Sequence, residues 1–501
     1  MRADADASRR RQLHDHVNAE IVNGSIQSKQ DAVRWLTWTF FYRRLLENPA
    51  YYGLDDASDP AAVDSFLSEI VDATVEDLVE AGTVRVCGAK GEGGEGEGGE
   101  AAALVAQPLG RIASQYYLKH TTAALFELSI TRALTRPRRR QAAGSSRSAV
   151  VVERLLSIVA GASEFDQMPV RHNEDCECAK IIESGRLRFP LDAGNADDPH
   201  TKVNILLQAH IGNLGGVLPN ADFTLDTRSC LENAPRIVQA ALELAASKRL
   251  LAVAVHLVYL LQMVVSGVWF DASSLLMLPK VDERVVEGHL SRAGIATIGD
   301  ALRDPPKAEA AVHRIGGLTK HDRGGIARAL RRFPSVALEA DVRAEGGPDA
   351  GGRVRFEVRA AVRDRRKGRG RGGAARAWSP RYPKIVNEGW VVVVGLLDDD
   401  DGTAGVDDGK LLALKRVQGA GAGGVTLRCE AAAGELAAAR ALRVYLLSDV
   451  YVGLDQSVDL PVPEHGGGGV DGGAAPCRAP SSSGDDDDDD DDEALLDFWI
   501  M

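Results

Sequence analysis

The sequence predicts a multidomain protein that is helical over its first two thirds and β-stranded in the last third. Apolar residues recur at helical spacing up to residue 334, and from Ser335 they alternate with a period of two. A run of eight aspartates, Asp485–Asp492, then predicts a disordered Gly/Asp-rich tail over 464–501. A chain of 501 residues is long enough for about three to five domains.

The composition is that of a soluble globular protein, with 26% charged and 45% apolar residues. The net charge is −13, but ten negative charges lie in the tail from Asp485 to Asp497, so the body carries about −3. We therefore expect no general attraction to nucleic acid outside the basic runs at 136–140 and 363–376. The six cysteines are scattered and no apolar leader follows Met1, which favours reduced thiols in the nucleus or cytoplasm.

The first predicted helices have recognisable starts. Ser28 and Asp31 form a capping-box-like beginning for a helix that should end before Asn48-Pro49. Asp59-Pro60 places an N-cap and a first-turn proline at the start of a second helix, and Gly82 should stop it. This order of helices is typical of a winged helix.

Two short strands complete that domain. Residues 83–86 and 104–106 have strand character and enclose a Gly/Glu-rich wing tip at 88–103 that we expect to be disordered. The winged-helix domain is predicted to cover 12–131, and a basic linker follows at 132–148.

The second helical region is predicted to be a bundle over 149–279. Within it Leu250–Phe270 is nearly all apolar and long enough for a bilayer, but its amphipathic neighbours favour a buried core helix. Residues 280–334 then predict a helix–loop–helix of helix-hairpin-helix type around Gly294.

The last folded region, 335–463, is predicted to be an immunoglobulin- or fibronectin-like β-sandwich, because about seven short strands are separated by Gly- and Asp-rich turns. The expected strands are 336–342, 354–360, 389–396, 411–417, 425–430, 441–448 and 457–462.

Motifs for catalysis are missing from the sequence. Gly409-Lys410 is followed by Leu411 instead of the Ser or Thr that a phosphate-binding loop needs. Asp282-Glu283 lacks the histidine of a DExH box. His172, Cys176 and Cys178 do not have zinc-site spacing and lack a fourth ligand. We therefore expect no catalytic residues, no metal and no cofactor.

Several blocks resemble one family in one order. The run LHDHVNAEIVNGSIQSKQDAVRWLTWTFFYRRLLENPAYYGL at Leu13–Leu54 resembles the winged helix of Ski-2-like DExH helicases with Sec63-type domains. Later blocks resembling the same family are QPLGRIASQYYLKHTTAALF, EFDQMPVRHNED, DDPHTKVNILLQAHIG, SSLLMLP, PRYPKIVNEGWVVVVG and VYLLSDVYVGLDQ. HTTAALF, DDPHTK and SSLLMLP are more similar to the activating signal cointegrator 1 complex branch than to the spliceosomal small nuclear ribonucleoprotein branch.

The resemblance implies a part of an ATP-driven helicase used in alkylation repair and the rescue of collided ribosomes. Because the motor motifs are missing, we expect a non-catalytic C-terminal portion that scaffolds the motor and guides single-stranded nucleic acid or binds partner proteins. Expected partners are helicase motor domains in cis or trans, protein subunits of a larger complex, and single-stranded RNA or DNA. No association with a membrane is expected. Met1 falls where a helix should continue, so a truncated or split gene is expected.

The alternative is a stand-alone protein- or RNA-interaction module in a splicing, repair or translation-rescue assembly. Either hypothesis places the chain in the nucleus, the cytoplasm or both.

The resemblance also implies that a bundle helix near 226–246 contacts the nucleic acid strand. Arg228, Arg236 and Gln239 fall on its polar stripe and are candidates to meet phosphates or base edges, and a solvated face is the other interpretation. Pro235 predicts a kink or a shortened helix. A second basic candidate, or else a solvated insertion, is the loop containing Arg365, Arg366, Lys367, Arg369 and Arg371.

Overall fold

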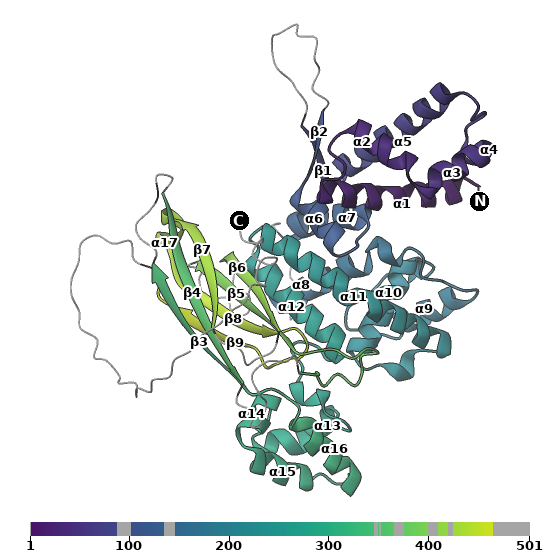
Figure 1. The fold of residues 1–501 in the computed structure, drawn as a ribbon. Helices are drawn as coiled ribbons and strands as arrows, with labels where there is room; N and C mark the ends of the chain where they lie inside the picture. Colours follow the sequence, from purple (N-terminus) through teal and green to yellow (C-terminus); the bar gives the residue numbers. More distant parts are fainter. Residues whose placement is uncertain are drawn as a thin grey trace, which may run out of the picture.

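The computed structural model shows a central group of helices with an N-terminal helical module on one side and two β-sheets on the other (Figure 1). The described residues are 2–87, 102–134, 146–344, 349, 352–364, 375–398, 409–418 and 424–463. The predicted acidic tail and the five basic-loop candidates lie outside them, as does nearly all of the predicted wing tip.

The N-terminal module consists of five helices and a two-stranded antiparallel hairpin. These elements are α1 Arg2–Asn23, α2 Lys29–Thr37, α3 Phe40–Glu47, α4 Pro49–Tyr52, α5 Pro60–Glu80, β1 Val84–Cys87 and β2 Ala103–Ala106. Both predicted helix starts are confirmed, because the Ser28 hydroxyl accepts from the Asp31 N–H and the Asp59 carboxylate accepts from the Ala61 N–H.

One helix prediction in this module was wrong. The helix expected to run from Ser28 to Asn48 is broken into α2 and α3. The Thr39 hydroxyl donates to the Leu36 carbonyl at 2.6 Å, and Thr39 has the extended backbone of an N-cap. This local hydrogen bond satisfies a carbonyl at the end of α2, and α3 begins after Thr39 without a side-chain cap bond.

In the described residues after the hairpin, twelve α-helices and six short 3-10 or π helices follow. The first two are α6 Pro108–Gln115 and α7 His120–Leu134. The bundle then contains α8 Arg147–Ala160, η1 Ser163–Phe165, α9 Glu174–Glu183, η2 Ala193–Asn195, α10 Pro199–Ile211, η3 Gly215–Val217, α11 Ala221–Ser247, α12 Leu251–Ser266 and η4 Ser274–Met277. The lower module contains α13 Glu283–Val285, η5 Val286–Leu290, η6 Ser291–Ala293, α14 Ile298–Arg303, α15 Pro305–His313 and α16 Lys320–Leu330. The remaining helix is α17 Ala433–Ala438, which the sequence did not predict.

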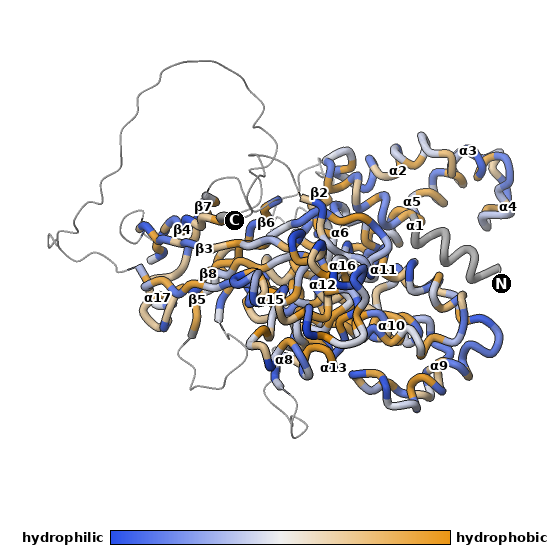
Figure 2. The backbone as a smooth tube through the Cα atoms, turned by 90° about the horizontal axis from the view of Figure 1, so that it is seen from below, coloured by the Kyte–Doolittle hydropathy of each residue, from blue (hydrophilic) through white to orange (hydrophobic). Residues whose placement is uncertain are grey.

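Helix α12 forms the apolar centre of the bundle. Most of its side chains are buried, which confirms the core-helix prediction for Leu250–Phe270, and Figure 2 shows apolar segments gathered around it. Among the described helices, none combines the length and the apolar character that a bilayer crossing needs.

All seven predicted strands are confirmed, and every pairing between them is antiparallel. One sheet has the order β3-β4-β7 and the other the order β6-β5-β8-β9. The strands are β3 Val336–Ala344, β4 Arg353–Asp364, β5 Gly389–Asp398, β6 Gly409–Gln418, β7 Gly424–Ala432, β8 Ala439–Ser448 and β9 Gln456–Leu460.

The buried residues form two separate cores. A small core lies between Val17 and Leu104, and a large one runs from Leu109 to Leu460 through the bundle, the lower module and both sheets. Helices α6 and α7, which the sequence assigns to the winged-helix domain, contribute their apolar side chains to the large core.

Close backbone approaches bring these parts together. A Cβ on Gly110 of α6 would lie 2.2 Å from the Thr83 carbonyl oxygen beside the hairpin. A Cβ on Gly395 of β5 would lie 2.5 Å from the side chain of Leu251 at the start of α12. Glycine at both positions therefore permits packing that any side chain would block.

Candidate nucleic-acid interface along helix α11

Helix α11 contains three of the predicted nucleic-acid residues, Arg228, Arg236 and Gln239, and contacts several neighbouring helices and strand β6. It begins where the Asn220 side chain accepts from the Phe223 N–H at 3.1 Å, and it continues for 27 residues. Its buried face packs against α10, α12 and α6. The helix is continuous through Pro235, so the predicted shortening was wrong.

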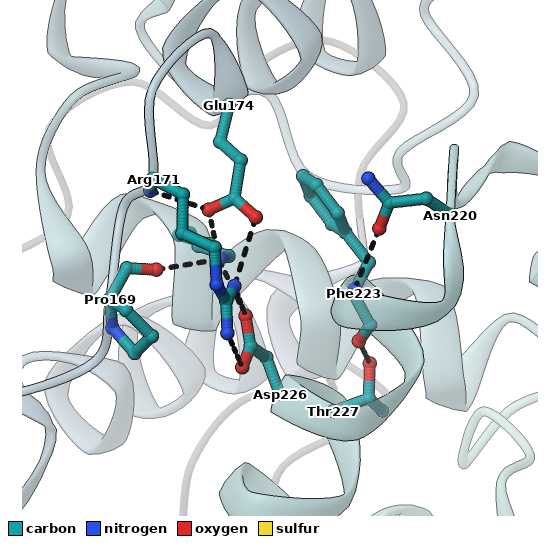
Figure 3. Close-up of polar contacts among 8 residues, drawn as sticks. Pro169, Arg171, Glu174, Asn220, Phe223, Asp226 and Thr227 are labelled. Atoms are coloured by element: carbon teal, nitrogen blue, oxygen red, sulfur yellow. Dashed lines mark hydrogen bonds and ion pairs between the residues drawn. The ribbon is translucent and has the colours of Figure 1, made fainter.

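A buried ionic cluster supports the first turns of α11 (Figure 3). The Lys202 side chain of α10 is 0% exposed, and its Nζ donates to the carboxylates of Glu174 at 2.6 Å and Asp226 at 2.7 Å. It also donates to the Pro169 carbonyl at 2.6 Å. Arg171 donates to both carboxylates, at 2.9 Å for Glu174 and at 2.7 and 3.1 Å for Asp226.

These contacts decide the charge of the cluster. Burial raises the pKa of Glu174 and of Asp226, but hydrogen bonds from Lys202 and Arg171 outweigh it and lower both pKa values below their usual range. The two carboxylates are therefore ionised beside two cations, which ties α9, α10 and α11 together. Removing one partner of such a buried set leaves an uncompensated charge.

Pro235 leaves one carbonyl of α11 without its helical donor, because proline has no N–H to bond the residue four positions before it. That carbonyl belongs to Leu231, and the Tyr382 hydroxyl donates to it at 2.8 Å. Burial raises the pKa of Tyr382 to about 12, so this hydroxyl stays protonated. The sequence contained no local signal of this contact, which joins residues 151 positions apart.

Tyr382 belongs to a strap, residues 375–388, that precedes β5 and crosses the bundle. Two backbone hydrogen bonds close the strap on itself, from the Ala377 N–H to the Val386 carbonyl and from the Glu388 N–H to the Ala375 carbonyl. Arg381 in the strap donates at 2.6 Å to the carbonyl of Gly267, which caps α12.

Arg236 is directed toward the C-terminal end of α6. Its Nη1 donates to the Tyr116 carbonyl at 2.7 Å and to the Tyr117 carbonyl at 2.5 Å, and its Nη2 donates to Asn233 Oδ1 at 3.1 Å. Tyr117 has a left-handed φ of 51°, which costs a non-glycine residue about 1–2 kcal/mol. Arg236 thus fixes a strained turn.

A second contact lies seven residues further along α11. The Tyr116 hydroxyl donates to the Glu243 carboxylate. Burial raises the pKa of Glu243, while the Tyr116 hydrogen bond and nearby Arg416 of β6 act in the opposite direction. The winged-helix side, the bundle and a β-sheet therefore meet at this end of α11.

The predicted residues lie in two different environments. Arg228 is exposed and faces Glu232 at 3.7 Å, and Glu232 also faces Lys384 of the strap at 3.6 Å. Arg236 and Gln239 are half-buried. Between residues 233 and 246, all of which are described, no residue is exposed, so only the N-terminal half of α11 presents an open polar surface.

Other candidate residues have structural surroundings. Asn173 occupies the N-cap position of α9 without a side-chain cap bond, and beside it the Arg171 N–H donates to the Glu174 carboxylate at 2.8 Å. Within the described part of the chain, no three His, Cys, Asp or Glu side chains are arranged to hold a metal ion. Lys410 lies on β6 and forms an ion pair with Glu435.

The comparisons with known proteins match almost all of the folded chain. The Sec63 Brl domain family matches residues 106–461, and a winged helix-turn-helix domain family matches residues 6–87.

Several curated relatives share this region. The DExH-box ATP-dependent RNA helicase DExH14 of Arabidopsis thaliana is 34% identical over 452 residues, which cover 90% of this chain and 18% of the relative. The activating signal cointegrator 1 complex subunit 3 of Mus musculus is 30% identical over 498 residues, covering 89% of this chain and 20% of the relative. The human U5 small nuclear ribonucleoprotein 200 kDa helicase is 30% identical over 453 residues, covering 90% and 18%.

The chain spans about a fifth of the length of these relatives. The resemblance stated from the sequence is confirmed for both the winged helix and the Sec63-type region. Because the Sec63 model matches well over half of the chain, this protein belongs to the Sec63 Brl domain family.

Proposed function

We propose that this chain is the non-catalytic C-terminal portion of a Ski-2-like nucleic-acid helicase of the cointegrator-complex type. It scaffolds the motor domains and guides single-stranded nucleic acid or binds partner proteins. The observation that carries this proposal is the match over about nine tenths of the chain to relatives named as helicases or as a cointegrator subunit, of which it spans a fifth. The motor domains act in cis or in trans, in the nucleus, the cytoplasm or both.

We propose the domain division made from the sequence as the working description of the molecule. Its folded parts are the winged helix 12–131, the bundle 149–279, the helix–loop–helix 280–334 and an immunoglobulin- or fibronectin-like sandwich 335–463. Seven antiparallel strands in two sheets support the last assignment.

Nucleic acid is proposed to lie along the exposed N-terminal half of α11. Arg228 supports this proposal because its guanidinium is exposed and only loosely paired. Exposed arginines bind phosphates without sequence preference and make binding salt-dependent. The basic-loop residues, outside the described part, are proposed as a second phosphate contact: Arg365, Arg366, Lys367, Arg369 and Arg371.

The deciding experiment adds the full chain to a separately expressed helicase core of a relative. We expect the two to associate and ATP-dependent unwinding of a duplex with a single-stranded overhang to rise above that of the core alone. A core that neither binds the chain nor changes its rate contradicts the scaffold function. In that case, salt-sensitive binding of single-stranded RNA by the chain alone supports the stand-alone interaction module.

A further inference from the structure

We propose that Tyr117 is a stacking platform for one base of single-stranded nucleic acid, and that Arg236 is the positioning residue that holds it in place. This inference rests on the proposed nucleic-acid function and adds to it a residue and a mode of recognition. Three properties of the turn after α6 carry it: the exposure of the ring, the conformation of its backbone and the clamp from α11.

The Tyr117 side chain is 85% exposed, which is unusual for a large ring on a folded surface. Among the described residues, its hydroxyl has no hydrogen-bond partner. The ring therefore contributes little to the packing of the protein. An accessible aromatic face is suited to stacking with nucleic-acid bases, because every base has a π-face.

The backbone of Tyr117 gives a second argument. A residue with positive φ directly after a helix is usually glycine or asparagine, because neither pays the full steric cost. Here the Leu118 N–H returns to the Ala113 carbonyl at 2.8 Å, the hydrogen bond that such a turn makes. Glycine would satisfy the turn equally well, so the structure alone does not account for a tyrosine. Retained strain of this kind is concentrated at functional sites.

The clamp gives the third argument. Both carbonyls of the turn, Tyr116 and Tyr117, are bound by the same Arg236 nitrogen, and Asn233 orients the other nitrogen. The guanidinium is thus occupied by protein groups, and it fixes the turn to the rigid helix α11. The backbone that carries the ring is therefore already ordered, and only the side-chain torsions of Tyr117 remain to be fixed when a base stacks on it.

The position of the turn fits a strand that follows α11. Arg236 lies eight residues after Arg228, which is about 12 Å along a helix axis. A strand whose phosphate contacts Arg228 can therefore place a base a few nucleotides away against Tyr117. We accordingly assign Arg228 to phosphate contact and Tyr117 to base contact.

The test measures fluorescence anisotropy of single-stranded RNA and DNA with the full chain over a range of salt concentrations. Tyr117→Leu is expected to weaken binding about tenfold, whereas Tyr117→Phe, which keeps an aromatic ring, is expected to bind as tightly as the original chain. The salt dependence of Tyr117→Leu stays that of the original chain, because no phosphate contact is lost. Arg236→Ala weakens binding in the same way, also without changing the salt dependence, because its charge acts on the turn.

Two controls separate stacking from general damage. Trp38 is 86% exposed on the winged helix, away from α11, so Trp38→Leu should stay within about twofold of the original affinity. Tyr117→Gly should bind as weakly as Tyr117→Leu while melting no earlier than the original chain, since it relieves the positive φ. Oligonucleotides containing 5-bromouridine should crosslink on illumination to the tryptic peptide 112–119.

The possible failures are distinguishable. A chain that binds no single strand at all contradicts the proposed guiding function and this inference together. A chain whose binding is weakened by Arg228→Ala but stays within about twofold in Tyr117→Leu overturns the stacking role alone. A salt slope lowered by about 1 in Arg236→Ala shows a direct phosphate contact and overturns the positioning role. Crosslinks found only outside 112–119 also overturn the stacking role.

Discussion

Helix α11 has different surroundings on the two sides of Pro235. Before the proline, its outer face exposes Leu225, Arg228 and Glu232, while its inner face contacts the ionic cluster through Asp226. After the proline, every residue up to 246 is at least half-buried, and Arg236 and Glu243 bond to Tyr116 at the end of α6. One helix therefore presents an open polar surface in one half and a structural junction in the other.

This difference shows that residues on one polar stripe do not share one function. Arg228 and Arg236 both lie on the solvent-directed side in a helical projection. Arg228 is exposed, whereas the Arg236 guanidinium donates hydrogen bonds to two backbone carbonyls. The tertiary neighbours of each half, and not the periodicity, decide which charges remain available to a ligand.

The largest effect on stability is expected when the ionic cluster beneath the N-terminal half of α11 is disrupted. Lys202→Met leaves the carboxylates of Glu174 and Asp226 facing only Arg171, and we expect a loss of about 3–5 kcal/mol in the free energy of unfolding. Lys248→Met is the matched control, because its exposed pair with Glu127 is worth less than about 1 kcal/mol. Urea denaturation measures both, and equal effects would contradict the buried-cluster account.

The loop between β8 and β9 contacts α12 through Asp455. Its carboxylate accepts from Gln262 at 2.8 Å and from the Ser448 N–H at 2.9 Å, and burial raises the pKa of Asp455 to about 7. In the native state Asp455 thus keeps a proton that the unfolded state releases near pH 4. The contribution of Asp455 to the free energy of unfolding is therefore fully present at low pH and is lost as the pH rises through about 7.

Because of Asp455, we expect the free energy of unfolding to fall by about 1–2 kcal/mol between about pH 5 and pH 8. This value includes a reduction for solvent screening, because the residue is only half-buried. Asp455→Asn keeps an acceptor and should remove this part of the pH dependence. Denaturation curves at both pH values measure it, and an unchanged pH dependence in Asp455→Asn would refute the assignment.

The boundary between the halves is tested by the pair of Pro235 and Tyr382. Tyr382→Phe leaves the buried Leu231 carbonyl without a donor and should cost about 1 kcal/mol of stability. In a Pro235→Ala background the new N–H bonds that carbonyl, so the same change should cost less than about 0.5 kcal/mol. A double-mutant cycle by urea denaturation gives the coupling, and equal costs in both backgrounds would show that the hydroxyl does not replace the helical bond.

The smallest effect on stability is expected at Arg228. Its exposed pair with Glu232 is worth about 0.3–0.5 kcal/mol, so Arg228→Ala should hardly change the denaturation midpoint. Binding of single-stranded RNA should weaken, and the slope of affinity against salt should fall by about 1. Lys248→Ala, beyond the covered half, should leave that slope unchanged. If the slope of affinity against salt fell in both Arg228→Ala and Lys248→Ala, the two halves of α11 would not differ in their contact with phosphates.

The strands of the β region were predictable from the sequence, in several cases because a strand with one buried face alternates with a period of two. Val354, Phe356 and Val358 on β4 show this alternation and are all buried. Helix starts were equally predictable where a cap residue such as Ser28 or Asp59 acts on its own first turn. These features depend on neighbours in sequence.

The candidate site was predictable only in part, because its decisive contacts join distant segments. The stripe containing Arg228 followed from helical spacing, but the occupation of Arg236 by a turn 120 residues earlier did not. Lys202 carried a signal that was missed. It lies three, four and seven residues before the buried Ile205, Leu206 and Ala209, so its helical phase places an ammonium in an apolar stripe. A lysine at such a position requires buried carboxylates.

The division into two cores has a consequence for synthesis of the chain on the ribosome. Among the described residues, the buried side chains of the small core lie between Val17 and Leu104, and the partly buried ones that pack against it lie between Leu13 and Ala106, so these contacts can form once that segment has emerged. The large core brings Leu109 together with residues as late as Leu460, and helix α11 receives the Tyr382 hydrogen bond only when the strap has been translated. We therefore expect the winged-helix core to fold during translation, whereas α11 acquires its final partners late, after long loop closures.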